Sequence, residues 1–216
     1  MSSSGDAFAW AFRDPAWPGK VLVQGLIVII PIVGWIAMTG WMMMAFENAR
    51  AGKNELPPAG FHLERGIGIF LVFFIYGLVL GIPGFILGIV GQITTYHTSS
   101  TFNPGTPLVG LAYLSFFVAG LFLRFLEPSL IVNTYHGGFA GGMDVQKVWR
   151  LATAHVNASV VAGILIFVSS VIGTLGFFCC IGFIFTIPYE NTITAGAAAW
   201  FDRQSQAPAP GAPPAA

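Results

Sequence analysis

Long runs of apolar residues, free of charge, dominate the chain. No Asp, Glu, Lys or Arg occurs in residues 21–46, 66–123 or 151–189. About 20 apolar residues in a helix cross the hydrocarbon core of a bilayer, so these stretches have room for one, two and nearly two crossings. The pattern predicts an all-α, polytopic helical membrane protein with about five transmembrane helices and two interfacial amphipathic helices.

Proline, glycine and turn residues place the predicted spans along the chain. The five spans are expected at residues 20–46, 66–93, 107–136, 156–173 and 177–200. Pro31 in the first span and Pro83–Gly84 in the second favour local breaks, because proline lacks a backbone donor. The sequence GTLG at residues 173–176 predicts a tight turn between the last two spans.

Two amphipathic segments are expected to lie at the membrane surface. Residues 6–17 carry aromatic side chains suited to the headgroup region and end near Asp14–Pro15. In GGMDVQKVWRLATAH, Asp144 is the expected N-cap of a helix with opposite apolar and charged faces. The predicted organisation is an N-terminal interfacial helix in residues 1–19, one transmembrane helical domain in residues 20–203 and a disordered Pro/Ala-rich tail in residues 204–216.

Basic residues near the span ends predict the orientation. Most of them follow the first, third and fifth spans: Arg50, Lys53, Arg65, Lys147, Arg150 and Arg203. Lys and Arg favour cytoplasmic loops, so these loops and the C-terminus are expected in the cytoplasm. Arg13 and Lys20 then lie on the opposite side as an exception. We expect residues 20–46 to cross fully; a re-entrant hairpin broken at Pro31 is the alternative that would remove the exception.

Three ionisable residues fall inside the predicted spans, where a charge costs about 2.5–3.5 kcal/mol at the helix centre. Glu127 follows Arg124 by three residues and shares its helix face. Counting the rise per residue puts Glu190 at a similar depth. We expect these three to form one interhelical network that acts as a structural clamp, with Asn133 and Asn191 as polar support. A proton- or substrate-linked site and simple exposure at the membrane boundary are the alternatives.

The remaining residues do not predict a binding, metal or catalytic site. The net charge is zero, which gives no reason to expect binding to nucleic acid. Cys179 and Cys180 are interpreted as apolar packing residues, and the four histidines match no metal-ligand spacing. GxxxG sequences at residues 77–81 and 84–88 favour packing within the chain over a dimer. No catalytic residue, cofactor or metal ligand is assigned, and the protein is not expected to be an enzyme.

Three stretches carry a family resemblance: AFRDPAWPGKVLVQGLIVIIPIVGWIAMTGW, ARAGKNELPP and CCIGFIFTIPYENTITAGAAAWFDRQ. They resemble the bacterial and archaeal integral membrane family catalogued as domain of unknown function 4013. The resemblance covers residues 8–203, with departures at Pro58 and Glu190. It implies a helical membrane fold in a prokaryotic inner membrane and no catalytic residue, because the family has no agreed activity.

Two functions are compatible with these sequence features. The leading one is a non-catalytic scaffold or accessory subunit of an envelope complex, in contact with the lipid bilayer and with another membrane protein as a candidate partner. The alternative is a small transporter or channel-like protein with a polar site at Arg124, Glu127 and Glu190. The shortage of further polar residues along a path weighs against transport.

Overall fold

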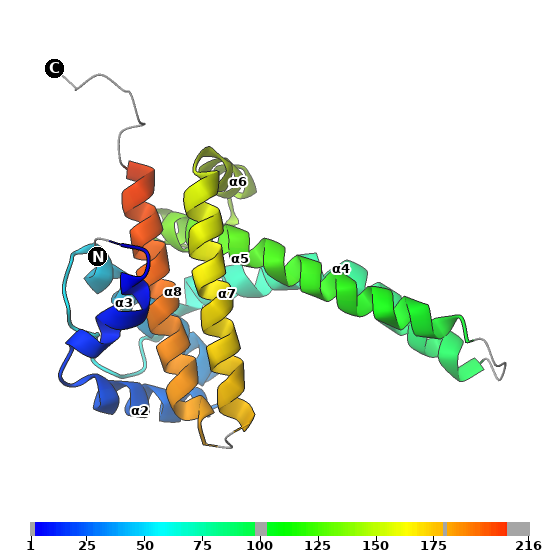
Figure 1. The fold of residues 1–216 in the computed structure, drawn as a ribbon, viewed down its shortest axis with the longest axis horizontal. Coiled ribbons are helices and arrows are strands. Elements are labelled where there is room, and N and C mark those ends of the chain that lie inside the picture. Colours follow the sequence, from blue (N-terminus) through cyan, green and yellow to red (C-terminus); the bar gives the residue numbers. More distant parts are fainter. Residues whose placement is uncertain (1–2, 98–102, 179–180, 207–216) are drawn as a thin grey trace.

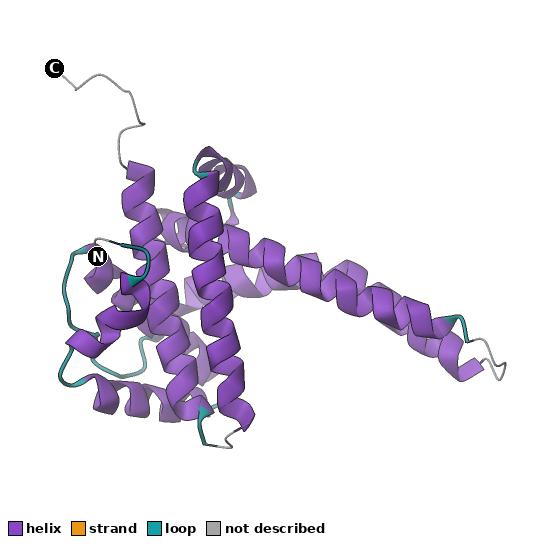
Figure 2. Cartoon of the chain, viewed as in Figure 1, coloured by secondary structure: helices purple, strands orange, loops and turns teal. Residues whose placement is uncertain are grey.

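The computed structural model describes residues 3–97, 103–178 and 181–206, which fold into helices joined by short loops (Figures 1 and 2). No β-strand occurs in these ranges, and the all-α prediction is confirmed. The elements are α1 Asp6–Ala9, the 3₁₀ helix η1 Trp10–Arg13, α2 Trp17–Val28, α3 Val33–Arg50, α4 Leu63–His97, α5 Gly105–Met143, α6 Val145–Ala154, α7 Val156–Phe178 and α8 Phe183–Gln206.

Helix α8 forms the centre of a helical body. It contacts α1, α2, α3, α5 and α7, and α7 lies along it in Figure 1. Residues 192–199 of α8 are all buried. Four of these are alanines, whose small side chains let the neighbouring helices approach closely. The body is therefore built around a helix that faces protein on most sides.

Helices α4 and α5 form a long antiparallel pair that projects from this body, crosswise to α7 and α8 (Figure 1). Glycines of α4 let α5 approach: a Cβ added at Gly84 would lie 3.1 Å from the Phe116 ring, and one at Gly88 would lie 3.7 Å from Ala112 Cβ. These glycines serve packing within the chain. Large apolar side chains such as Phe85 and Tyr113 point outward along the pair.

Within the described residues, three helices are long and apolar enough to cross a membrane: α4, α5 and α7. Their length and hydropathy support a membrane protein. Helix α8, expected as the fifth span, is not among these three, because Glu190, Asn191 and several threonines lower its hydropathy. The exposed apolar surface of α4 and α5 fits contact with lipid rather than water.

The predicted first span is two helices instead of one. Helix α2 ends at Val28 and α3 begins at Val33, and Ile32 between them has a φ of 64°. Pro31 cannot donate a backbone hydrogen bond, and Gly34 has no side chain, so its backbone packs directly against Ile27 O. The break predicted at Pro31 is therefore present, as a bend that divides residues 20–46 into two helices.

The bend also changes the place of Lys20. Lys20 Nζ donates a hydrogen bond of 2.6 Å to Leu56 O, in the loop that follows α3. Lys20 therefore lies beside the basic loop that was expected on the other side of the membrane. This proximity favours the re-entrant alternative for residues 20–46.

Three other expected boundaries differ. Pro83 lies inside a continuous α4. Helix α5 passes residue 136 and changes direction at Gly138, whose φ is 61°. Helix α8 extends to Gln206, so residues 204–206 of the predicted tail are helical, while 207–216 lie outside the described residues.

The predicted turn at residues 173–176 is helical and belongs to α7. Gly173 and Gly176 face α8, where a Cβ at Gly176 would overlap Thr186 Oγ1. These glycines serve close approach of two helices instead of a turn. Cys179 and Cys180, interpreted from sequence as packing residues, lie outside the described residues.

The two amphipathic segments behave differently. The N-terminal one docks on α8: Trp10 is buried and its Nε1 donates to Thr192 O at 3.0 Å. Its 3₁₀ helix ends at Arg13, as the Asp-Pro sequence predicts. In α6 the Asp144 carboxylate accepts from the Lys147 backbone N–H, which confirms the N-cap.

Candidate functional site

A cavity of about 490 Å³ lies among α3, α4, α5, α7 and α8. Its volume falls within the range of about 300–1,000 Å³ that is common for ligand pockets. The charged side chains on its wall are the three that the sequence singled out. The wall is otherwise lined by aromatic, aliphatic and uncharged polar side chains, with the aromatic ones being Trp35, Phe70, Phe73, Phe74 and Phe177.

One guanidinium faces two carboxylates in this cavity. Arg124 Nη1 donates to Glu127 Oε2 at 2.7 Å, and Arg124 Nη2 lies 3.8 Å from Glu190 Oε1. The first pair is local to α5, whereas the second joins α5 to α8. Glu127 is buried, and Arg124 and Glu190 are partly exposed. The predicted interhelical network therefore exists as two ion pairs that share one arginine.

The two carboxylates are held unequally. The Arg124–Glu127 contact has the length of a charge-assisted hydrogen bond, whereas 3.8 Å is too long for one. Among the residues that the structure describes, Arg124 supplies the one ion pair of Glu190. Glu190 is thus the charged group of this cavity that has the most capacity left for another partner.

A glycine on α7 fixes the place of the Glu190 carboxylate. A Cβ added at Gly173 would overlap Glu190 Oε2, so the absence of a side chain there provides the space that the carboxylate occupies. Sequence reasoning treated Gly173 as part of a turn. Its position in the fold makes it a positioning residue for Glu190.

The two predicted asparagines take different places. Asn191 lines the cavity, and its Nδ2 donates to Ile187 O at 2.9 Å. Asn133 is not on the cavity wall, and its Nδ2 donates to Ser129 O at 2.8 Å within α5. Both amides thus donate to a carbonyl of their own helix, and of the two only Asn191 also lines the cavity.

Four hydroxyl groups on the cavity wall were missed from sequence: those of Thr39, Ser170, Thr174 and Thr194. Thr39 Oγ1 donates to the backbone of α3 or α4, Ser170 Oγ to Phe167 O and Thr174 Oγ1 to Ser170 O. Ser170 and Thr174 are four residues apart and so lie on one face of α7. That spacing is the one local feature that could have indicated them.

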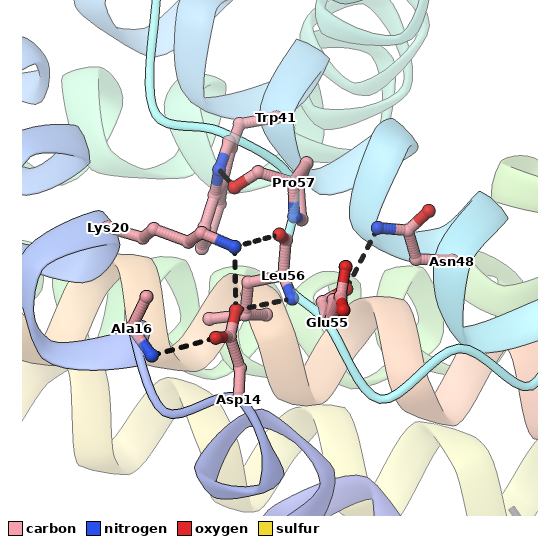
Figure 3. Close-up of polar contacts among 8 residues, drawn as sticks. All are labelled: Asp14, Ala16, Lys20, Trp41, Asn48, Glu55, Leu56 and Pro57. Atoms are coloured by element: carbon pink, nitrogen blue, oxygen red, sulfur yellow. Dashed lines mark hydrogen bonds and ion pairs between the residues drawn. The ribbon is translucent and has the colours of Figure 1, made fainter.

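A second acidic centre lies at the start of α2 (Figure 3). The Asp14 carboxylate accepts from Lys20 Nζ at 2.7 Å, from Ala16 N at 2.8 Å and from Leu56 N at 2.9 Å. Trp41 Nε1 donates to the neighbouring Pro57 O at 3.2 Å. These bonds fasten the loop that follows α3 to the chain entering α2.

The environment of Asp14 holds its pKa below the usual value. Burial alone raises the pKa of Asp14. The hydrogen bonds from Lys20, Ala16 and Leu56, together with the charge of Lys20, lower this pKa by more than burial raises it. Because every oxygen of this carboxylate has a close donor, the cluster is a completed structural contact and leaves no capacity for a ligand.

A third cluster joins the ends of α3 and α8. Arg50 Nε donates to Asp202 Oδ2 at 2.5 Å, and its guanidinium lies 5.3 Å from the Tyr135 ring centroid. Arg203 Nη1 donates to Ala49 O at 3.0 Å. Within the described ranges no group of His, Cys, Asp and Glu is placed to hold a metal ion.

The chain matches a known protein family. The sequence profile of the family described as "Protein of unknown function (DUF4013)" matches residues 23–181, which is most of the chain. No curated protein and no solved structure matches the chain. The match contains α3, α4, α5 and α7 of the cavity wall, while Glu190 lies beyond its end.

Proposed function

We propose that this chain, which belongs to the DUF4013 family of proteins of unknown function, is a non-catalytic membrane protein that binds a small ligand in the cavity around Arg124, Glu127 and Glu190. Of the two functions considered from sequence, this is the small transporter or channel-like one. The observation that carries the proposal is the carboxylate of Glu190 on the wall of a cavity of ligand size. A charge kept on such a wall is costly unless it has a partner.

The geometry of the ion pairs supports a ligand over a clamp alone. A clamp between α5 and α8 gains most when the charges are in hydrogen-bond contact. Arg124 forms that hydrogen bond with Glu127 of its own helix, and its Nη2 lies 3.8 Å from Glu190 Oε1. The cross-helix pair is the weaker of the two, which leaves Glu190 available to a bound molecule.

Native purification tests this function. The full chain would be purified mildly into nanodiscs, and mass spectrometry would identify every molecule that it retains. We expect a stoichiometric small molecule that is lost in Glu190→Gln and retained in Glu64→Gln, a carboxylate at the exposed start of α4. Retention that is equal in both variants, or no retained molecule at all, would contradict the proposal.

A scaffold or accessory subunit of an envelope complex is the second candidate. The projecting α4–α5 pair favours it, since large apolar side chains cover its outer surface far from the body. The same mass spectrometry would detect this function as a membrane protein that is retained in fixed ratio. The partner would stay bound in Glu190→Gln, because the cavity lies at the other end of the pair.

The proposed location is the inner membrane of a prokaryotic cell with the C-terminus in the cytoplasm. Basic residues near the ends of α3, α6 and α8 support this orientation: Arg50, Lys147, Arg150 and Arg203. Reporter fusions after Gln206 check the side of the membrane. Activity of a periplasmic reporter there would contradict the orientation.

A further inference from the structure

We propose that the ligand of this cavity is an amphiphilic amine: a primary or secondary ammonium group attached to a compact apolar body. The inference rests on the proposed function and adds the class of molecule that is bound. Three independent properties of the wall lead to it. They are its charge balance, the direction of its hydrogen bonds and its aromatic side chains.

The charge balance favours a cation. The wall carries one guanidinium and two carboxyl groups, and the guanidinium is in hydrogen-bond contact with Glu127. A cationic ligand beside Glu190 restores neutrality in a region where unpaired charge is costly. An anionic ligand would add a third negative group next to the same two carboxylates.

Apart from Arg124, which donates to Glu127, and Thr194, the polar uncharged groups of the wall use a donor hydrogen on a backbone carbonyl. The hydroxyls of Thr39, Ser170 and Thr174 donate to backbone carbonyls, and the amide of Asn191 donates to Ile187 O. Their oxygen lone pairs remain as acceptors. A ligand that donates hydrogen bonds matches this wall, and a primary or secondary ammonium donates two or three.

Aromatic rings surround the rest of the space. Trp35, Phe74 and Phe177 are exposed at the protein surface as well as lining the cavity, so they border its opening. Their faces attract a cation, and their edges and the nearby methionines pack against an apolar body. The opening is lined by lipid-compatible side chains, which suits a ligand that arrives from the bilayer.

Such an ammonium group has two natural sources. It is carried by free lipophilic amines and by the headgroups of amino-phospholipids. Both present the same donor to Glu190, so the wall alone does not separate them, and the lipid composition in the experiment does.

Binding of matched adamantane probes tests the inference. The full chain would be placed in nanodiscs of an uncharged glycolipid and dialysed to equilibrium against adamantan-1-amine, adamantan-1-ol or adamantane-1-carboxylate. The three probes share one apolar body and differ in the head group. We expect saturable binding of the amine, at least tenfold tighter than that of the alcohol or the carboxylate, and at least tenfold weaker in Glu190→Gln.

A second pair of variants separates position from charge. Gly173→Ala keeps every charged group and moves the Glu190 carboxylate, whereas Gly120→Ala adds a methyl group where nothing lies within 4 Å. We expect weaker amine binding in Gly173→Ala and wild-type binding in Gly120→Ala. Because both are small changes, folded protein with unchanged binding in Gly173→Ala would count against the role of Glu190.

The outcomes are distinct. Equal binding of the three probes, or amine binding unaffected by Glu190→Gln, overturns the ammonium assignment. If native protein still retains a different small molecule in a Glu190-dependent way, the proposed function stands and only the ligand class fails. If adamantan-1-amine binds as expected, its binding is then compared between glycolipid and phosphatidylethanolamine nanodiscs. Weaker binding of the amine in phosphatidylethanolamine identifies the lipid headgroup as a competitor, and unchanged binding identifies a free amine as the ligand.

Discussion

The cluster at Asp14 and the cluster at Glu190 each place a carboxylate near a basic side chain, yet their surroundings differ. Asp14 accepts three hydrogen bonds between 2.7 and 2.9 Å, which engage both of its carboxylate oxygens. Glu190 has one ion pair at 3.8 Å and lines a cavity of about 490 Å³. The first carboxylate holds two segments of the chain together, whereas the second is only partly engaged.

The contrast shows how to separate structural charges from functional ones in an apolar protein. A charged group that the fold has satisfied completely contributes to stability and leaves nothing for a ligand. A charged group that the fold positions without satisfying is costly to keep. Its presence is then explained by what it binds. Measurements of stability should therefore respond strongly to Asp14 and weakly to Glu190.

The largest expected effect is that of Asp14→Ala. The change removes the acceptor of three hydrogen bonds, so the Lys20 ammonium loses its carboxylate and two backbone N–H groups lose their acceptor, which costs about 3 kcal/mol of unfolding free energy. Thermal unfolding in detergent measures it. Glu55→Gln is the control, because Glu55 is exposed and its replacement is expected to leave the unfolding midpoint unchanged. Equal midpoints for both variants would show that the cluster is not an anchor.

Arg124→Ala is expected to have the next largest effect on stability. It leaves the buried Glu127 carboxylate without its hydrogen-bond donor, at a cost of about 2 kcal/mol. The same unfolding assay applies, with Arg150→Ala on the exposed face of α6 as the control. A loss no greater than that of Arg150→Ala would mean that the pair contributes nothing to the fold.

Acidification provides a smaller and gradual test of the Asp14 cluster. The folded-state pKa of Asp14 lies below its unfolded value of about 3.9. Its stabilisation is therefore complete above that unfolded value and is lost as pH falls through the lower folded-state pKa. The midpoint difference between wild type and Asp14→Asn should stay constant from pH 7 to about 5 and narrow below about 4. If the midpoint difference between wild type and Asp14→Asn instead widened in acid, the folded-state pKa of Asp14 would lie above its unfolded value, contrary to this prediction.

The smallest expected effect is that of Glu190→Gln on stability. The cross-helix contact is long and partly exposed, so its loss should change the unfolding free energy by less than about 0.5 kcal/mol. Glu127→Gln, which disturbs the shorter pair, should cost more in the same assay. If Glu190→Gln destabilised the protein as much as Glu127→Gln, the clamp between α5 and α8 would be the better description.

Features governed by short-range sequence patterns were predictable. Charge-free runs indicated a helical membrane protein, and a spacing of three residues indicated the Arg124–Glu127 pair. Asp144 was recognisable as an N-cap, because capping depends on a side chain and a backbone N–H three residues apart. In each case the interacting groups lie within one helical turn or one apolar run.

Other features depended on contacts between distant segments. Pro31 indicated the break in residues 20–46, but the packing of Gly25 in α2 against Ile184 in α8 is a contact that no local pattern reveals. A turn was predicted at residues 173–176 because glycines favour turns. In the structure Gly173 and Gly176 instead allow α7 to approach α8 closely. The charge-free run in residues 151–189 also suggested a span at residues 177–200, although α8 is too polar to count among the apolar helices and its buried residues face protein.

The sequence by itself determined the class of the protein, its family and the three charged residues that matter most. Only the tertiary structure decided that Glu190 is weakly held, that Gly173 makes room for it and that aromatic and hydroxyl groups complete a cavity around it. The physical reason is range. Hydropathy and helical spacing act over a few residues, whereas the cavity is formed by five helices drawn from most of the chain, and its volume depends on how all of them pack.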